Sequence, residues 1–181
     1  LKHDDAKGRV YRVQISTLAA DGIVMLPKLK TANRDTVELG TWGVLSFLSQ
    51  RDLHSVYRRG VIDDLIELYR RYQPRIRTCF VDGTVALEGN GPVHGSPVPM
   101  NVLIAGQNTV AVDGVASMIM GFDPEDVDHL AVAQAHGLGD WREVFQMHPE
   151  TLPLPVRPFA PPTRRKSALE PLKYHPVMAR A

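Results

Sequence analysis

The sequence predicts an α/β fold, a single domain in which helices cover a mixed or mostly parallel sheet, followed by an extended, proline-rich C-terminal tail. Apolar runs of strand length alternate with segments of helical periodicity. A length of 181 residues suits one principal domain. From Thr151 onward, prolines replace periodic apolar residues. We therefore divide the chain into an α/β domain, residues 1–150, and a C-terminal extension, residues 151–181.

Two strands are predicted in the N-terminal part of the chain. In GRVYRVQISTL, Tyr11, Val13 and Ile15 alternate with polar residues, which is the period of a half-buried strand. The apolar run IVML, residues 23–26, is typical of a strand covered on both faces. We expect this strand to end at PKLKT, residues 27–31, which we interpret as a loop.

The middle of the chain contains the clearest helix. Apolar residues recur at helical spacing in VIDDLIELYRRY, residues 61–72, and Pro74 follows shortly after. The run IRTCFV, residues 76–81, is predicted as a buried strand. It leads into VDGTVALEGNGPVHG, residues 81–95, which we interpret as a glycine-rich loop.

A strand and two helices are predicted after this loop. PMNVLIAG, residues 99–106, is a short strand, and NTVAVDGVASMIMG, residues 108–121, turns into a helix with Asp113 as a candidate N-cap. A second helix is predicted in FDPEDVDHLAVAQAHG, residues 122–137, because an aspartate and a proline mark its start and a glycine marks its end.

Composition argues against several classes of protein. Lysine and arginine number 21 against 20 aspartates and glutamates, so the net charge of +1 gives no reason to expect a nucleic-acid partner. No apolar run approaches the roughly 18 residues of a membrane span, and the N-terminal residues lack the apolar segment of a signal peptide. We predict a cytoplasmic protein with no membrane partner. Cys79, the only cysteine, is interpreted as a buried small side chain.

Three motifs resemble those of a known family. LPKLKT, then VDG followed by LEGNGPVHGSPV, then VLIAGQNTVAVDGVASMIMGFDPEDVDHLAVAQAHGLG keep the order and spacing of the domain of unknown function family 362, from about Asp21 to Gly139. The resemblance implies no established activity. Some family members carry ferredoxin-like cysteine clusters, which suggests redox or metal-centre work, but one cysteine cannot ligate an iron–sulfur cluster within this chain.

The sequence departs from the family pattern at two places. Ala32 follows Thr31 where family members usually carry a histidine, and Leu39 and Gly40 stand where a lysine–asparagine pair is usual. His54, in RDLHS, is similar to a histidine common in the family, and we take it as a candidate ligand-binding residue. Chemistry that depends on the missing side chains would be altered or lost.

Ligands in open α/β sheets bind beyond the carboxyl ends of strands, which draws attention to PKLKT, the glycine-rich loop and the region of Asp113. GNGPVHG is not a dinucleotide fingerprint, because Pro92 and an extended segment stand where the helix would begin. Gly89 and Gly91 are candidates for binding an anion through their amides. The alternative is that these glycines only permit positive φ in a turn.

Glu88 is the preferred acid–base or metal-binding residue, because neither a turn nor a cap explains it. Asp82 and His94 are further catalytic candidates. Asp82 and Asp113 could join Glu88 around a divalent metal such as Mg²⁺. The alternative for both aspartates is a structural role, in a turn or at a helix cap.

The predicted function rests on charge near the two loops. Lys28 and Lys30 would project to the same side of an extended segment and bind a carboxylate or phosphate, or else remain solvated. His129 and His136, seven residues apart on one helix, form only a weak zinc pattern. We predict a small-molecule enzyme that binds an anionic metabolite or cofactor near PKLKT and EGNGP, with no reaction assigned. The alternative is a noncatalytic accessory protein for cofactor or metal-centre assembly, and a redox partner or a second copy of the chain remains open.

Overall fold

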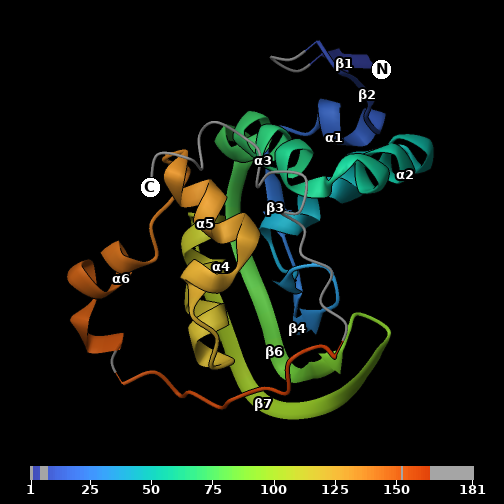
Figure 1. Cartoon of the computed structure of the whole chain (residues 1–181). Coiled ribbons are helices and arrows are strands. Elements are labelled where there is room, and N and C mark those ends of the chain that lie inside the picture. The colour runs from blue at the N-terminus through green and yellow to red at the C-terminus, as the bar shows by residue number, and fades with distance from the viewer. Residues whose placement is uncertain (1, 5–7, 152, 164–181) are drawn as a thin grey trace.

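The sheet is organised around one long strand, β6 (Ile76–Asn90), in a computed structural model that describes residues 2–4, 8–151 and 153–163 (Figure 1). β3 (Ile23–Met25) and β4 (Lys28–Ala32) pair with β6 in parallel, and β7 (His94–Gly106) pairs with it antiparallel. β5 (Thr36–Val37) extends the sheet beyond β4. The sheet is therefore mixed, as predicted.

β7 lies at the opposite side of β6 from β3 and β4. Within β6, Cys79 pairs with Met25 of β3 on one side and with Gly106 of β7 on the other. Asp82 likewise pairs with Lys28 of β4 and with Leu103 of β7. A residue in a sheet has only two neighbouring strands, so β3 and β4 follow one another along one side of β6. β6 and β7 form a long curved hairpin (Figure 1).

Helices complete the single domain. α4 (Thr109–Ile119) packs on β6 and β7, and α5 (Asp128–Ala135) packs on α4 and on α3 (Val61–Tyr72). The 3-10 helix η1 (Thr41–Phe47) packs against α3 and α4. Burial is complete or nearly so at the contacting apolar faces, which hold residues such as Ile62, Leu65, Val81, Val110 and Leu130.

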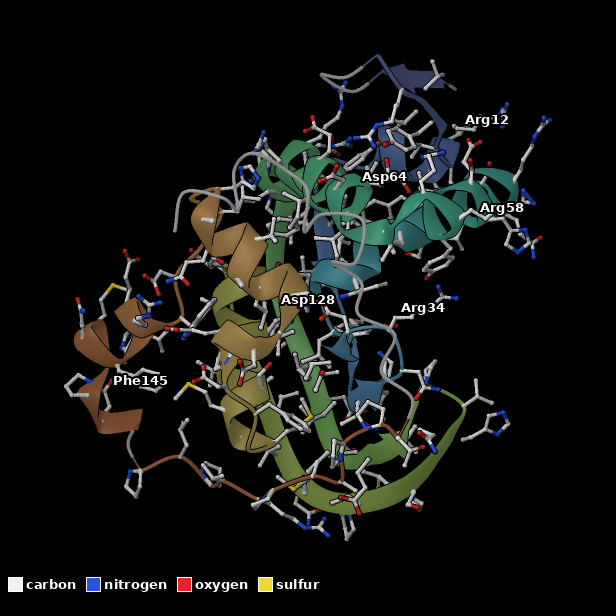
Figure 2. All side chains as sticks on the ribbon, viewed as in Figure 1. Arg12, Arg34, Arg58, Asp64, Asp128 and Phe145 are labelled. Atoms are coloured by element: carbon white, nitrogen blue, oxygen red, sulfur yellow. The ribbon has the colours of Figure 1, made fainter. Side chains whose placement is uncertain are left out.

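The remaining elements lie at the periphery of this core. They are β1 (Lys2–Asp4), β2 (Val10–Arg12), α1 (Ile15–Ala19), α2 (Gln50–Arg59), η2 (Gln73–Arg75), η3 (Pro124–Asp126), α6 (Arg142–Met147) and η4 (Pro149–Thr151). Asp64 of α3, labelled in Figure 2, is fully buried and pairs with Arg9 at 2.8 Å and with Arg59 at 3.1 Å. The pair with Arg9 attaches the N-terminal segment to α3, and the pair with Arg59 links α2 to α3.

The helix predicted over residues 61–72 is confirmed with the same bounds. Two strand predictions are wrong. The alternating pattern ends at Val13, and Ile15, which is 69% exposed, begins α1 instead of continuing a strand. PKLKT is not a loop, because residues 28–32 form β4 and pair with β6. The segment is held in the sheet because it pairs with β6 on one edge and with β5 on the other, although its two lysines do not suggest a strand.

The glycine-rich segment is also mostly strand. β6 continues to Asn90 and β7 begins at His94, so only a tight turn separates them. The prediction that Asp113 caps α4 is wrong, because Asn108 is the N-cap and accepts from the Ala111 amide at 3.0 Å. Asp113 instead lies one turn inside the helix, fully buried.

The described part of the C-terminal extension runs from α6 back to the turn end of the β6–β7 hairpin (Figure 1). Its Phe159 is buried, and the amides of Arg157 and Phe159 donate to carbonyls at the end of α4. Residues 164–181 of the predicted extension lie outside the described residues.

Candidate functional site

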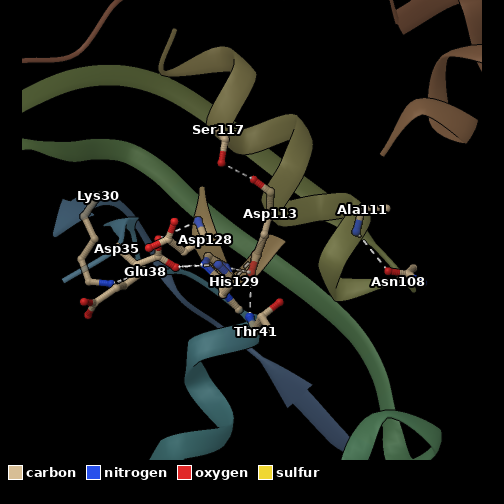
Figure 3. Close-up of polar contacts among 11 residues, drawn as sticks. Lys30, Asp35, Glu38, Thr41, Asn108, Ala111, Asp113, Ser117, Asp128 and His129 are labelled. Atoms are coloured by element: carbon tan, nitrogen blue, oxygen red, sulfur yellow. Dashed lines mark hydrogen bonds and ion pairs between the residues drawn. The ribbon is translucent and has the colours of Figure 1, made fainter. Parts of the chain in front are cut away.

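Five ionisable side chains gather between β4, η1, α4 and α5, and we call them the polar centre: Lys30, Asp35, Glu38, Asp113 and His129 (Figure 3). Asp35, Asp113 and His129 are completely shielded from solvent. Charged groups are almost never fully buried unless they are paired. The partners of each residue therefore determine what the centre can do.

Asp35 holds His129 in place. Its carboxylate accepts the main-chain amides of Asp128 and His129, each at 2.9 Å, and lies 2.5 Å from His129 Nδ1. The carboxylate thus caps the start of α5 and orients the imidazole. The next residue, Thr36, has a φ of 50°, which is a strained conformation for a β-branched residue. Such strain persists where the surroundings fix the backbone, and it clusters at functional sites.

Asp113 holds the start of η1, at the other end of the segment that begins with Asp35. Its two carboxylate oxygens accept the amides of Gly40 at 2.9 Å and Thr41 at 2.7 Å, at the start of η1. Gly40 has no room for a side chain, because an added Cβ would lie 2.5 Å from the sulfur of Cys79. The segment from Asp35 to Thr41 is therefore held at both ends by buried carboxylates.

His129 lies between these two aspartates and is protonated at neutral pH. Burial lowers the pKa of the imidazole, but the charges of Asp35 and Asp113 and the hydrogen bond to Asp35 outweigh burial and raise the pKa to about 9. Nε2 lies 4.0 Å from Asp113 Oδ2, which is an ion-pair distance but too long for a hydrogen bond. The protonated ring carries a fixed positive charge between two carboxylates.

Lys30 and Glu38 have pKa values that move toward neutrality. Burial raises the pKa of Glu38, although the charge of Lys30 works against this, and burial lowers the pKa of Lys30. Lys30 Nζ donates a hydrogen bond to the main-chain carbonyl of Glu38. Displaced pKa values of this kind are typical of groups that exchange protons in catalysis, although structural ion pairs produce them too.

Arg34 supplies positive charge at the rim of the centre. Its guanidinium lies 3.9 Å from the centroid of the Tyr57 ring and its side chain is exposed to solvent. Figure 2 shows Arg34 on the segment that follows β4. The charge of Arg34 is close enough to Glu38 to act against the rise of the pKa of that carboxyl group.

Several buried polar atoms in and next to the polar centre have no hydrogen-bond partner among the described residues. They include His129 Nε2, Trp42 Nε1, Thr41 Oγ1 and Glu38 Oε1. The rings of Trp42 and His129 meet edge to face, with centroids 6.0 Å apart. An unpaired buried donor or acceptor destabilises the fold by about 1–3 kcal/mol, so these atoms mark a place where water or a ligand would be held.

The structure brings Lys28 and Asp82 together, but at the surface. Lys28 Nζ lies 2.8 Å from Asp82 Oδ2, and both side chains are about half exposed. Hydrogen bonds from Lys28 and Thr84 hold the pKa of Asp82 below its usual range, so Asp82 stays ionised. Lys30 lies two residues further along β4 and turns to the polar centre instead.

Glu88 and the two glycines contact the chain itself. Glu88 Oε2 accepts the amide of Ala160 at 3.0 Å, and the Gly89 amide donates to the carbonyl of the same residue at 2.8 Å. The Gly91 amide donates to the carbonyl of Gly89. A Cβ on Gly91 would lie 1.9 Å from the Thr31 carbonyl oxygen, so this glycine allows β4 and the hairpin to approach closely.

The other predicted residues lie apart from these groups. His94 is exposed next to the hairpin turn, and His54 is exposed on α2. Asp82, Glu88 and Asp113, predicted to share a metal, have separate partners in Lys28, Ala160 and the start of η1. Within the described residues, no three histidine, cysteine, aspartate or glutamate side chains are grouped to hold a metal ion.

Sequence reasoning missed Asp35, Glu38 and the role of His129. Asp35 lies three residues after the end of β4, and Glu38 directly follows β5. The carboxyl end of a strand such as β4 is where ligands bind in α/β sheets. That signal was present, but β4 itself was interpreted as a loop. His129 follows Asp128 at the start of a helix, and no local pattern marks it as the partner of a residue 94 positions away.

The fold and the polar centre define an α/β protein with a group of largely buried ionisable side chains beside an exposed arginine. The family model described as a domain of unknown function (DUF362) matches residues 5–118, more than half of the chain. The chain therefore belongs to this family, which confirms the resemblance in its motifs.

One similar protein is the thylakoid-associated protein sll1697 of Synechocystis sp., which is 27% identical over 133 residues. The match covers 70% of this chain and 41% of that protein, so the chain spans less than half the length of this relative. No solved structure matches the chain. Among the described helices, none is both long and apolar enough to cross a bilayer.

Proposed function

We propose that the chain is a small-molecule enzyme that binds an anionic metabolite or cofactor at Lys30, with Glu38 as the acid–base group. This places the predicted anion site at the polar centre, beside β4, instead of at the EGNGP turn. The observation that carries the proposal is a partly buried lysine next to a partly buried glutamate, beside buried polar atoms, Glu38 Oε1 and His129 Nε2, that have no hydrogen-bond partner among the described residues. Burial there lowers the pKa of Lys30 and raises the pKa of Glu38.

Charge balance supports an anionic ligand. Asp35 and Asp113 each accept hydrogen bonds from two main-chain amides, and both lie next to the protonated His129. Their negative charge is therefore offset by groups of the protein itself. A raised pKa favours the neutral form of Glu38. Burial lowers the pKa of Lys30, but nearby negative charge, such as that of Asp113 or of a bound anion, favours its charged form. Lys30 and, at the rim, Arg34 are then the cations left to meet a ligand carboxylate or phosphate.

The unpaired buried atoms support the same place. His129 Nε2 and Trp42 Nε1 are donors that a ligand oxygen could accept from, and Glu38 Oε1 is free of partners among the described residues. A carboxyl group next to a bound anion can move a proton to or from it when its pKa lies near the working pH.

The test is to identify what the protein holds. Wild type, Lys30→Ala and the matched control Lys28→Ala would be purified without denaturation, and small molecules released from each would be identified by mass spectrometry. We expect an anionic compound with wild type and Lys28→Ala that is lost from Lys30→Ala. Equal retention by all three proteins, or no retained anion in wild type, would contradict the proposal.

A second variant separates an enzyme from an accessory protein. Glu38→Gln keeps the shape of the side chain but removes its exchangeable charge. For the compound identified above, we expect Glu38→Gln to bind normally and to convert it at least about 100-fold more slowly, the lower range for loss of a general acid or base. Binding without conversion by wild type would favour the noncatalytic role.

A further inference from the structure

A cavity lies along β7, and it shares α4 with the polar centre, which takes Asp113 from this helix. This cavity of about 740 Å³ is bounded by residues 102–108, by one face of α4 and by residues between 140 and 155, and we call it the β7 groove. Its volume is within the range of about 300–1,000 Å³ that is typical of ligand sites. The proposed function does not involve this groove.

The groove runs beside a strand edge that has no partner. β7 pairs with β6 on one side, and no described strand pairs with its other side. Five consecutive residues, Val102–Gly106, line the groove. Alternate side chains of a strand point to opposite faces, so five in a row can line one cavity only if the main-chain edge itself faces it.

Over residues 102–106 this edge has little of the usual protection, although a register shift at Asn101, which has a φ of 52°, interrupts β7 just before them. Native proteins cover exposed edges or break them with charged residues and prolines. Prolines occur in β7 at positions 97 and 99, but the segment MNVLIAG, residues 100–106, has neither a proline nor a charge. Leu103 is 66% exposed, and Met147 of α6 across the groove is 64% exposed. An uncharged apolar edge of this kind is suited to pairing with another strand.

α6 leaves room for such a strand. Figure 1 shows this helix at the side of the molecule, apart from α4 and α5, and Figure 2 shows Phe145 on it. No residue of α6 is buried. The helix therefore forms an outer wall of the groove without filling it.

The β7 groove carries negative charge, which favours an occupant with positive charge. Asp140 and Glu143 are among its lining residues, and no lysine or arginine is found among those described. The neighbouring Arg142 turns away and pairs with Glu125 at 2.8 Å. A segment with a basic residue next to its apolar residues would match this wall, whereas a segment with acidic residues would be repelled.

A second copy of this chain fits less well. Antiparallel pairing of two β7 edges about a two-fold axis would place both copies of Asp140 and Glu143 on the same face of the joined sheet. Residues 100–106 bring no basic side chain to offset these charges. We propose that the β7 groove binds an extended apolar segment of another protein that carries lysine or arginine, and that this segment adds to the sheet as a strand beside β7.

The probe is a fluorescein-labelled synthetic peptide of alternating valine and threonine that ends in two lysines. Two matched peptides carry either two glutamates in place of the lysines or N-methyl groups on alternate amides of the central residues. We expect measurable binding of the lysine peptide by fluorescence anisotropy and at least about tenfold weaker binding of both matched peptides, because they lose charge matching and main-chain pairing respectively.

Variants of exposed residues test the place of binding without disturbing the core. Leu103→Lys and Glu143→Lys should each weaken the lysine peptide at least about fivefold, and Leu26→Lys, at a leucine 75% exposed outside the groove, should not. Bound peptide should slow hydrogen exchange of amides within Val102–Gly106. Equal binding by all variants, equal binding of the N-methylated peptide, or no binding of the lysine peptide would overturn the proposal. A wild-type dimer that Leu103→Lys converts to a monomer would also overturn it, in favour of a second copy as the occupant.

Discussion

The protonated state of His129 predicts how stability depends on pH. The pKa of His129 is raised to about 9 in the folded chain from an ordinary 6.5. A raised pKa means that the folded state binds the proton more tightly, so the stabilisation is fully present below pH 6.5 and is lost as the pH rises through about 9. Each tenfold difference in proton affinity is worth about 1.4 kcal/mol, so the loss is about 3 kcal/mol.

The assay is urea unfolding of wild type and His129→Asn at pH 6 and pH 10. Asparagine keeps a donor close to the position of Nδ1, next to Asp35, but cannot be protonated. We expect the stability difference between the two proteins to be about 3 kcal/mol larger at pH 6 than at pH 10. Lys30, whose pKa burial lowers, changes stability in the opposite direction in alkali, but it is present in both proteins. A stability difference that stays constant with pH would refute a protonated His129.

Two further predictions concern the turn end of the β6–β7 hairpin. Gly91→Ala should lower the free energy of unfolding by about 1–3 kcal/mol because its Cβ meets the Thr31 carbonyl, whereas Gly89→Ala, in open space at a φ of 79°, should cost about 1 kcal/mol. Urea unfolding measures both, and an equal loss would contradict the steric argument. Glu88→Ala should speed hydrogen exchange of the Ala160 amide, while Glu88→Gln, which retains an oxygen acceptor, should do so less. Unchanged exchange in Glu88→Ala would show that this hydrogen bond does not hold the C-terminal segment.

The sequence predicts those elements whose burial is decided locally. α3 shows its amphipathic period over 12 residues, so its bounds could be predicted from the chain alone. The strand β4 could not be predicted in this way, because its two lysines are stabilised by partners that are distant in the sequence or outside the strand. Lys28 pairs with Asp82, and Lys30 donates a hydrogen bond to the Glu38 carbonyl. Both partners are supplied by the tertiary fold.

The candidate site shows the same limit. Glu88 attracted attention because no local motif explained it, but its partner is the amide of Ala160, 72 residues away. Asp35 and His129 are separated by 94 residues and carry no shared local pattern. Lys30 and Asp113 were both singled out from the sequence, and the structure places both in the polar centre, although Asp113 acts there through the amides of η1.

The geometry of the polar centre also divides its roles. A histidine is the usual choice for proton exchange near neutral pH, but two aspartates keep His129 charged up to about pH 9. It can stabilise negative charge there, but it cannot give up its proton easily at neutral pH. Burial displaces the pKa values of Glu38 and Lys30 toward neutrality, so in the proposed function these two groups, and not His129, exchange the proton with the ligand. If the chain is an enzyme, the pH dependence of turnover should therefore follow Glu38 and Lys30, and Glu38→Gln should abolish one limb of the pH profile, the acidic limb if Glu38 accepts the proton and the alkaline limb if it donates it, whereas His129→Asn should leave that limb in place.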